Sequence, residues 1–381
     1  MLTFHPLKVA ELRREASDAV CIAFEVPEHL REVYRFIPGQ HLGIRLHLAG
    51  QELRRTYSIC SGVDEQHLRI GVRTHDQGRV SRHLARNVQV GDTLDVLTPT
   101  GRFFAQPEPS SARTYCAFAG GSGITPILGI IRNVLAQEPH SRCIVFYGNR
   151  TIANIMFAEE LLALKDRYLE RLALYFVLSR EPQDVELFNG RLDRDKVMSL
   201  GATLFEPSAV DAFYLCGPGT MLENARAALL SLGVDGTRIH AERYASEVSP
   251  EVQAVAGDQA VAADSAVAGD SPSKQGHSPQ GQSSTGQSPI QVTVVMDGRR
   301  RSFAMPSSGT TVLQAAEAEG LDLPYACRAG VCSTCRTKVT RGAVTMTENY
   351  ALEPWEVEQG YVLCCQALPA SAELELTYDE C

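Results

Sequence analysis

The chain has 381 residues, eleven cysteines and a formal net charge of −9, and this length favours two or three domains. The negative charge argues against non-specific nucleic-acid binding, which needs clustered Lys and Arg to neutralise phosphates. No window approaches 18 uninterrupted apolar residues and no secretory signal is recognisable, so we expect a cytoplasmic protein without a membrane span. In that compartment, clustered cysteines serve metal chemistry more often than disulfides.

The N-terminal part of the sequence predicts a β-barrel. Runs such as 41–48 and 93–99 alternate apolar and polar residues and are bounded by glycine or proline, which is typical of antiparallel strands. The character of the sequence changes near residue 110, so we expect residues 1–108 to form the first domain.

Two short stretches of this barrel suit a flavin. The first offers a guanidinium for a pyrophosphate, an aromatic face for the isoalloxazine ring and a hydroxyl for its N5 atom. Read alone, it also fits an edge strand with solvated arginines. The second offers a turn, a cation and backbone donors for a phosphate, and the two together favour FAD. The residues are Arg55, Thr56, Tyr57 and Ser58 in the first stretch and Gly78, Arg79, Val80 and Ser81 in the second.

Residues 109–245 predict an α/β domain with a parallel sheet. Strand-like runs alternate with helix-like runs, which is the pattern of successive βαβ units. The expected strands cover 114–119, 143–147, 172–178 and 212–216, and the expected helices cover 125–137, 157–168 and 220–232.

Small and polar residues follow three of these strands, at the sheet edge where open α/β domains bind nucleotides. A glycine loop leads into a helix start that favours phosphate, although Pro126 stands where a Rossmann fingerprint would have its third glycine. A hydroxyl and a guanidinium after the third strand suit the 2′-phosphate of NADP. Cys216 taken alone would more often be a buried core thiol. The residues are Gly121, Gly123, Thr125, Pro126, Ser179, Arg180, Cys216, Gly217 and Pro218.

Residues 246–289 contain no aromatics and are rich in Ala, Gly, Ser, Gln and Pro, so they cannot bury enough surface to fold. We expect a flexible linker with a span of roughly 33 to 40 Å, although an insertion without mechanical consequence is the alternative. Beyond it, residues 290–381 predict a small α+β domain. This domain should begin with a hairpin that turns on Asp297 and Gly298, and a short helix should end at Gly320.

Three cysteines of the last domain point to an iron–sulfur cluster. Cys327, Cys332 and Cys335 have the spacing C-x4-C-x2-C of plant-type [2Fe-2S] ferredoxins. A structural zinc site would want a second close pair, whereas the later cysteines are the adjacent Cys364 and Cys365, which point opposite ways on a strand. Small residues between the ligands let backbone N–H groups approach the sulfurs. One of the two adjacent cysteines is therefore the expected fourth ligand.

The chain resembles the ferredoxin–NADP reductase superfamily joined to a plant-type ferredoxin domain. The resemblance is carried, in chain order, by the segments RTYS, GRVS, GGSGITP, YGNR, LSRE and CGPGTM and by the cysteine pattern. The domain order and the segments NGRLDRDKV and NYALEPWEVEQGYVLCCQALP are similar to the reductase subunits of phenylacetyl-CoA epoxidase systems, and steroid-hydroxylase reductases are close in pattern. The resemblance implies an FAD-binding barrel, an NAD(P)-binding α/β domain and a β-grasp [2Fe-2S] domain.

The resemblance also implies roles for single residues around the flavin. Arg55 would hold the FAD pyrophosphate, Tyr57 would lie on the isoalloxazine ring and Ser58 would approach N5. Cys216 would border the nicotinamide, as would Thr125. The segment Glu242-Arg243-Tyr244 is similar to the E-x-Y end of these reductases, in which the tyrosine covers the flavin. The implied catalytic residues are therefore Ser58, Cys216 and Tyr244.

Further roles concern the nucleotide and the cluster. Asn149 and Arg150 would lie near the adenosine of the nucleotide, and the pair after the third strand would select NADP. The last cysteine of the family directly precedes Gln-Ala, which selects Cys365 over Cys364 as the fourth ligand. The implied ligand set is Cys327, Cys332, Cys335 and Cys365.

The implied function is that of an NADPH-dependent reductase that passes electrons through FAD and [2Fe-2S] to an oxygenase component. The favoured acceptor is a diiron phenylacetyl-CoA epoxidase, and a Rieske-type ring or steroid hydroxylase is the alternative because it needs the same electron supply. A non-catalytic redox sensor is an alternative of another class, but a sensor needs no continuous hydride path. The acidic segments 351–358 and 372–380 suit a basic docking surface or simply form a solvated face.

Overall fold

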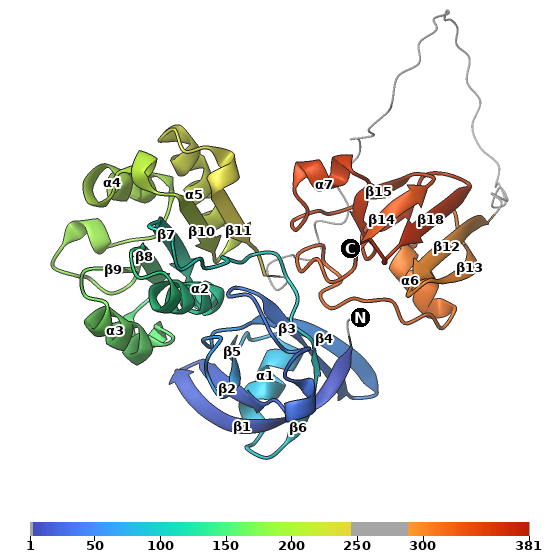
Figure 1. The fold of residues 1–381 in the computed structure, drawn as a ribbon, viewed down its shortest axis with the longest axis horizontal. Helices are drawn as coiled ribbons and strands as arrows, with labels where there is room; N and C mark the ends of the chain where they lie inside the picture. The colour runs from blue at the N-terminus through green and yellow to red at the C-terminus, as the bar shows by residue number, and fades with distance from the viewer. Residues whose placement is uncertain (1–2, 245–288, 381) are drawn as a thin grey trace, which may run out of the picture. The chain divides into compact units, whose positions relative to one another are not determined.

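The computed structural model describes residues 3–244 and 289–380 (Figure 1). The expected linker, apart from residue 289, lies outside these residues. The described residues form two compact units, the first comprising 3–244 and 324–334 and the second comprising 289–323 and 335–380. Within the described part of the chain, no helix is both long and apolar enough to cross a membrane.

The N-terminal domain is a six-stranded antiparallel sheet that curls into a barrel (Figure 1). A β-bridge between Ile59 and Ile70 links the first and last strands of the sheet and closes the barrel. Fully buried side chains such as Phe24 and Ile44 fill the interior. The expected antiparallel barrel is therefore confirmed. Its elements are β1 (Phe4–Ala16), β2 (Ala19–Glu25), β3 (His41–Leu48), β4 (Gln51–Ser58), β5 (Leu68–Arg73), α1 (Arg79–Arg86) and β6 (Thr93–Leu97), and the strand order is β4-β3-β6-β1-β2-β5.

The second domain of the first unit has a five-stranded parallel sheet with helices on both faces, as expected. The elements are β7 (Thr114–Gly120), α2 (Ile124–Gln137), β8 (Arg142–Asn149), α3 (Ala158–Arg167), β9 (Leu172–Leu178), α4 (Arg194–Leu204), β10 (Ala212–Cys216), α5 (Gly219–Ser231) and β11 (Ile239–Glu242). Side chains of α2 and α3 share one hydrophobic core with the sheet, and those of α4 and α5 share another.

The strand order β11-β10-β7-β8-β9 positions the candidate nucleotide site. From β7 the chain crosses to β8 on one side, while β10 lies on the other side of β7. The carboxyl ends of β7 and β10 therefore form the switch point at which open α/β sheets bind ligands.

The second unit contains a mixed sheet in the order β13-β12-β18-β14-β16 (Figure 1). Its hairpin turns on Asp297 and Gly298, which both have a positive φ, as the sequence predicts. A capping box between Thr311 and Gln314 starts the expected helix. The elements are β12 (Ile290–Met296), β13 (Arg299–Met305), α6 (Val312–Ala318), β14 (Arg336–Arg341), β15 (Val344–Met346), α7 (Pro354–Glu358), β16 (Tyr361–Leu363), β17 (Ala367–Pro369) and β18 (Glu373–Thr377).

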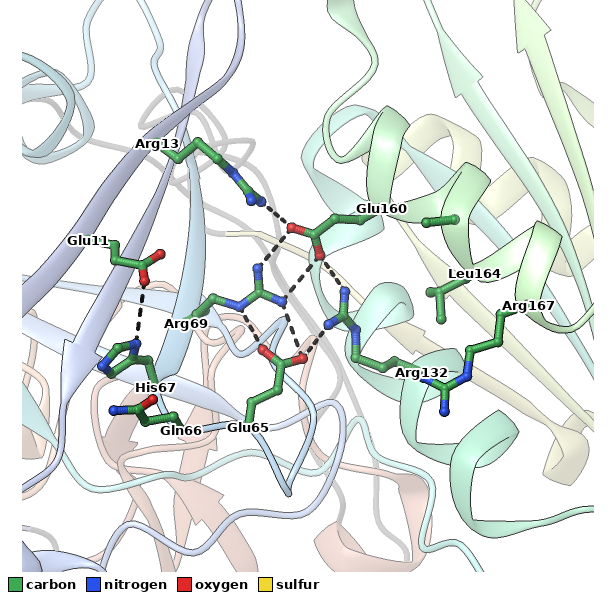
Figure 2. A pocket seen from close by; sticks show the side chains of 11 residues that line it. Glu11, Arg13, Glu65, Gln66, His67, Arg69, Arg132, Glu160, Leu164 and Arg167 are labelled. Atoms are coloured by element: carbon green, nitrogen blue, oxygen red, sulfur yellow. Dashed lines mark hydrogen bonds and ion pairs between the residues drawn. The ribbon is translucent and has the colours of Figure 1, made fainter.

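A network of ion pairs joins the barrel to the α/β domain within the first unit. Figure 2 shows Glu160 of α3 between Arg13 of β1, Arg69 of β5 and Arg132 of α2, with Glu65 bridging two of the arginines. Arg69 Nη1 and Nη2 donate to the two Glu160 carboxylate oxygens at 2.9 and 3.2 Å. The network holds together the two domains that carry the candidate flavin and nucleotide sites.

Candidate functional site

The three residues expected to be catalytic meet between the barrel and the α/β domain of the first unit. Ser58 ends β4, Cys216 ends β10 and Tyr244 follows β11. Ser58 Oγ donates to Glu242 Oε2 at 3.3 Å and also lies 3.3 Å from Tyr244 Oη. Cys216 is fully buried and its thiol neighbours the Tyr244 phenol. A hydroxyl, a thiol, a carboxylate and a phenol are thus gathered at the switch point of the sheet.

The chemistry of Tyr244 follows from its surroundings. Burial raises the pKa of its phenol well above the usual value, and the neighbouring Cys216 thiol and Glu242 carboxylate add to the effect. The phenol therefore remains protonated near neutral pH. It donates to the Ser122 carbonyl oxygen at 3.4 Å, which ties it to the glycine loop after β7.

Two side chains of this cluster had no role assigned from the sequence. Glu242 accepts from Ser58, and its other oxygen lies 3.7 Å from His41 Nδ1. His41 is buried at the start of β3, and its Nε2 lies 3.1 Å from Thr100 Oγ1. A histidine in an apolar strand carries no spacing signal, so only the fold reveals that it contacts this group.

The second flavin stretch adopts a conformation different from the one expected. Residues 78–81 were predicted to form a turn, but Gly78 is the N-cap of α1 and the next three residues form its first turn. Gly78 has no side chain to occupy the free N–H groups at this helix start, which suits a phosphate. The Arg79 guanidinium donates to Gln51 Oε1 at 2.8 Å and to the Leu48 carbonyl at 3.2 Å. The backbone N–H groups at the start of α1 are therefore a better candidate contact for the pyrophosphate than Arg79, whose guanidinium already has two hydrogen-bond acceptors.

The other flavin residues are placed on β4. Arg55 is exposed, and its Nη1 donates to the Arg54 carbonyl at 2.7 Å. Thr56 and Tyr57 are half-buried. An exposed guanidinium and an aromatic ring two residues further along the strand lie on the same side of it, which fits a flavin dinucleotide.

The glycine loop after β7 packs against the end of β10 so closely that side chains are excluded. A Cβ atom on Gly123 would lie 1.9 Å from the Cys216 carbonyl oxygen, and one on Gly217 would lie 2.9 Å from the Gly120 nitrogen. Thr125 is buried, and its hydroxyl donates to the Ser122 carbonyl at 2.8 Å. The glycines therefore form a cradle of bare backbone at the switch point, as nucleotide loops require.

The ends of β8 and β9 form the adjoining part of this edge. The Ser179 N–H donates to the Asn149 carbonyl at 3.0 Å, and the Arg180 N–H donates to the Arg150 carbonyl at 2.9 Å. Arg150 and Arg180 are both exposed, so two guanidinium groups lie on neighbouring strand ends. Asn149 is buried, and its side-chain amide lies close enough to the Tyr147 phenol to affect the pKa of that phenol. Among the described residues the amide makes no hydrogen bond of normal geometry. A buried amide and two exposed cations at this edge of the sheet fit a phosphorylated nucleotide.

The cysteine loop directs a backbone donor at one of the expected ligand sulfurs. Arg328, Gly330 and Ser333 have positive φ angles, and the Ala329 N–H donates to Cys327 Sγ at 3.3 Å. This compact loop turns a backbone donor toward sulfur, which stabilises a thiolate. All ten described cysteines are free of disulfides. No three His, Cys, Asp or Glu side chains of the described residues are grouped to hold a single metal ion.

Cys364 and Cys365 occupy different surroundings in the second unit. The Cys364 thiol is fully buried beside Tyr378, which interacts with it, and burial raises its pKa. Cys365 Sγ instead accepts from the Gln366 side-chain amide at 3.6 Å. The Cys364 thiol thus belongs to the core of this unit, which favours Cys365 as the thiolate that binds iron.

Comparisons with known proteins define the class to which these sites belong. Three family models match in chain order: the oxidoreductase FAD-binding domain at 6–104, the oxidoreductase NAD-binding domain at 118–227 and the 2Fe-2S iron-sulfur cluster binding domain at 294–370. The chain is therefore an oxidoreductase with FAD, NAD(P) and [2Fe-2S] cofactors. It belongs to the family of electron-transfer reductases that serve oxygenase systems.

Curated relatives of two oxygenase systems illustrate matches that run over nearly the whole chain. The chain is 41% identical to one of the subunits of the 1,2-phenylacetyl-CoA epoxidase of Escherichia coli (strain K12), over 100% of this chain and 99% of the relative. It is 30% identical to the ferredoxin reductase component of 3-ketosteroid-9-alpha-monooxygenase of Rhodococcus rhodochrous, over 98% and 96%. The solved structure of phthalate dioxygenase reductase has the same fold, with a TM-score of 0.54 at 20% identity over 98% of each chain.

Proposed function

We propose that this chain transfers electrons from NADPH to a diiron phenylacetyl-CoA epoxidase. The observation that carries the proposal is the 41% identity to an epoxidase component along the whole chain, compared with 30% to a ketosteroid monooxygenase component. A Rieske-type hydroxylase is the competing acceptor. The oxygenase that accepts the electrons also determines which substrate is oxidised.

The bound cofactors supply the redox chemistry, in which FAD accepts a hydride and the [2Fe-2S] cluster carries single electrons. Side chains of this protein orient the two rings that react. With the cofactors bound, Ser58 would offer its hydroxyl toward the flavin, Cys216 would border the nicotinamide and the protonated Tyr244 would lie over the flavin. Glu242 anchors Ser58 through their 3.3 Å hydrogen bond.

The proposed preference for NADPH rests on the ends of β8 and β9. Arg180 and Arg150 offer two guanidinium groups to the 2′-phosphate, and Ser179 adds a hydroxyl beside them. Asn149 would contact the adenosine side of the nucleotide with its side-chain amide. NADH lacks the 2′-phosphate, so it would gain little from the two cations.

The domain boundaries and ligands are part of the same proposal. We assign FAD to 1–108, the nicotinamide nucleotide to 109–245 and the cluster to 290–381, joined by the segment 246–289. The proposed cluster ligands are Cys327, Cys332, Cys335 and Cys365. A cytoplasmic location suits this set because thiolate ligands persist in a reducing compartment.

Reconstitution tests the proposed acceptor. The purified chain would be combined with a diiron phenylacetyl-CoA epoxidase or with a Rieske hydroxylase, and NADPH-dependent product would be measured for each. Product with the diiron enzyme alone supports the proposal, whereas product with the Rieske enzyme alone overturns it. Reduction of cytochrome c by NADPH in the same preparation excludes a redox sensor without catalytic activity.

A further inference from the structure

Gln366 lies directly after the proposed fourth cluster ligand, and its side chain is directed at that ligand. Gln366 is buried, and its Nε2 donates to Cys365 Sγ at 3.6 Å, within the range of an N–H···S hydrogen bond. Its neighbour Cys365 is buried as well. Water therefore has little access to compete for this contact.

A second residue fixes the orientation of the Gln366 amide. The Thr347 hydroxyl donates to Gln366 Oε1 at 2.5 Å, which leaves the NH2 end of the amide for the sulfur. The Thr347 N–H also donates to the Gln366 carbonyl at 3.1 Å, and this bond extends the pairing of β15 with β17. The backbone ladder thus holds Thr347 and Gln366 opposite each other, within reach of their side-chain hydrogen bond.

We propose that the Gln366 amide donates a hydrogen bond to the Cys365 thiolate and raises the reduction potential of the cluster, with Thr347 as the positioning residue. The inference rests on the proposed ligand role of Cys365. Reduction adds negative charge to the cluster and its sulfurs, so a donor at a ligand sulfur stabilises the reduced form more than the oxidised form. Gln366 therefore makes the cluster a better electron acceptor.

The test is an EPR-monitored redox titration of the full chain with its cofactors, which reads the potential without an oxygenase. Gln366→Leu removes the donor at similar volume, and Thr347→Val releases the amide while Gln366 remains. At the wild-type midpoint we expect Gln366→Leu to lower the ratio of reduced to oxidised cluster about threefold, which equals roughly 30 mV for one electron. Thr347→Val should shift the ratio in the same direction by less. Gln291→Leu, on the exposed side of β12, is the matched control and should leave it unchanged.

An unchanged or raised potential in Gln366→Leu overturns the proposal. If Gln366→Leu assembles no cluster, the test relies on the reduction potential of the cluster in Thr347→Val. An unchanged potential in Thr347→Val also overturns the proposal. Serine variants of the adjacent cysteines separate this failure from failure of the ligand assignment. If the cluster is retained in Cys365→Ser and lost in Cys364→Ser, Cys365 is not the fourth ligand. If the cluster is instead lost in Cys365→Ser and retained in Cys364→Ser, while Gln366→Leu leaves the potential unaltered, the ligand assignment stands and only the proposed role of Gln366 is refuted.

Discussion

Replacing Glu160 with glutamine should destabilise the first unit, because this carboxylate joins the barrel to the α/β domain. Burial by itself would raise the pKa of Glu160, but hydrogen bonds and charge from Arg69, with Arg132 and Arg13, outweigh burial and lower it from 4.5 to about 2. Glutamine keeps the shape and removes the charge. The three arginines then lose their shared anionic partner.

The lowered pKa sets the size of the effect. A fall from 4.5 to about 2 corresponds to about 3 kcal/mol of stabilisation of the charged form. The Glu160 side chain is 18% exposed and borders an open cavity of about 520 Å³, so solvent screening reduces the expected loss to roughly 1 to 2 kcal/mol. Because the pKa is lower in the folded state, this stabilisation is complete above about pH 5 and disappears as the pH falls toward 2.

Urea unfolding monitored by flavin fluorescence measures this loss, since the flavin reports on the first unit. Glu159→Gln is the matched control because Glu159 is the exposed neighbour on the same helix. We expect the Glu160→Gln midpoint to lie below wild type at pH 7 and the difference to shrink between pH 5 and pH 3. A difference equal to that of Glu159→Gln, or one independent of pH, would refute the reasoning.

Three further predictions concern the nucleotide and cluster sites. Arg180→Ala should raise the KM for NADPH about tenfold or more and leave the KM for NADH nearly unchanged, because the change removes one charge-assisted contact to the 2′-phosphate. Steady-state kinetics with each nucleotide measure the two KM values. Cys365→Ser should abolish the visible and EPR signals of the cluster, whereas Cys364→Ser should retain them and lose stability only. Gly123→Ala should weaken nucleotide binding at least tenfold in a fluorescence titration, because its Cβ would lie 1.9 Å from a carbonyl oxygen.

Each of these expectations has a result that contradicts it. Equal changes in KM for NADPH and NADH would mean that Arg180 does not distinguish the two nucleotides. The control is Arg191→Ala, which replaces an exposed arginine of the same domain. A cluster that survives Cys365→Ser would reassign the fourth ligand. Unaltered nucleotide affinity in Gly123→Ala would mean that the loop can shift away from β10 without cost.

The fold class follows from local patterns in the sequence. The strands predicted at 172–178 and 212–216 have these bounds in the structure, because continuous apolar runs between turn residues specify buried parallel strands. The hairpin at Asp297 and Gly298 follows equally from residues that tolerate a positive φ. Within the α/β domain, the helix α4 and the strand β11 were not predicted. The helix contains Gly201 within its length and the strand has only four residues, so neither gives a clear periodic signal.

The sequence by itself determined the residue types of the sites, because RTYS, the glycine loop and C-x4-C-x2-C are contiguous stretches whose chemistry is local. Only the tertiary structure decided which side chains meet. Ser58 and Glu242 are 184 positions apart, and their hydrogen bond exists because β4 and β11 end at the same place in the first unit. For the adjacent Cys364 and Cys365, the resemblance already favoured Cys365, and the structure adds the physical reason, because the Cys364 thiol packs in the core beside Tyr378. Contacts of this kind depend on strands that are distant in the chain, so no local pattern encodes them.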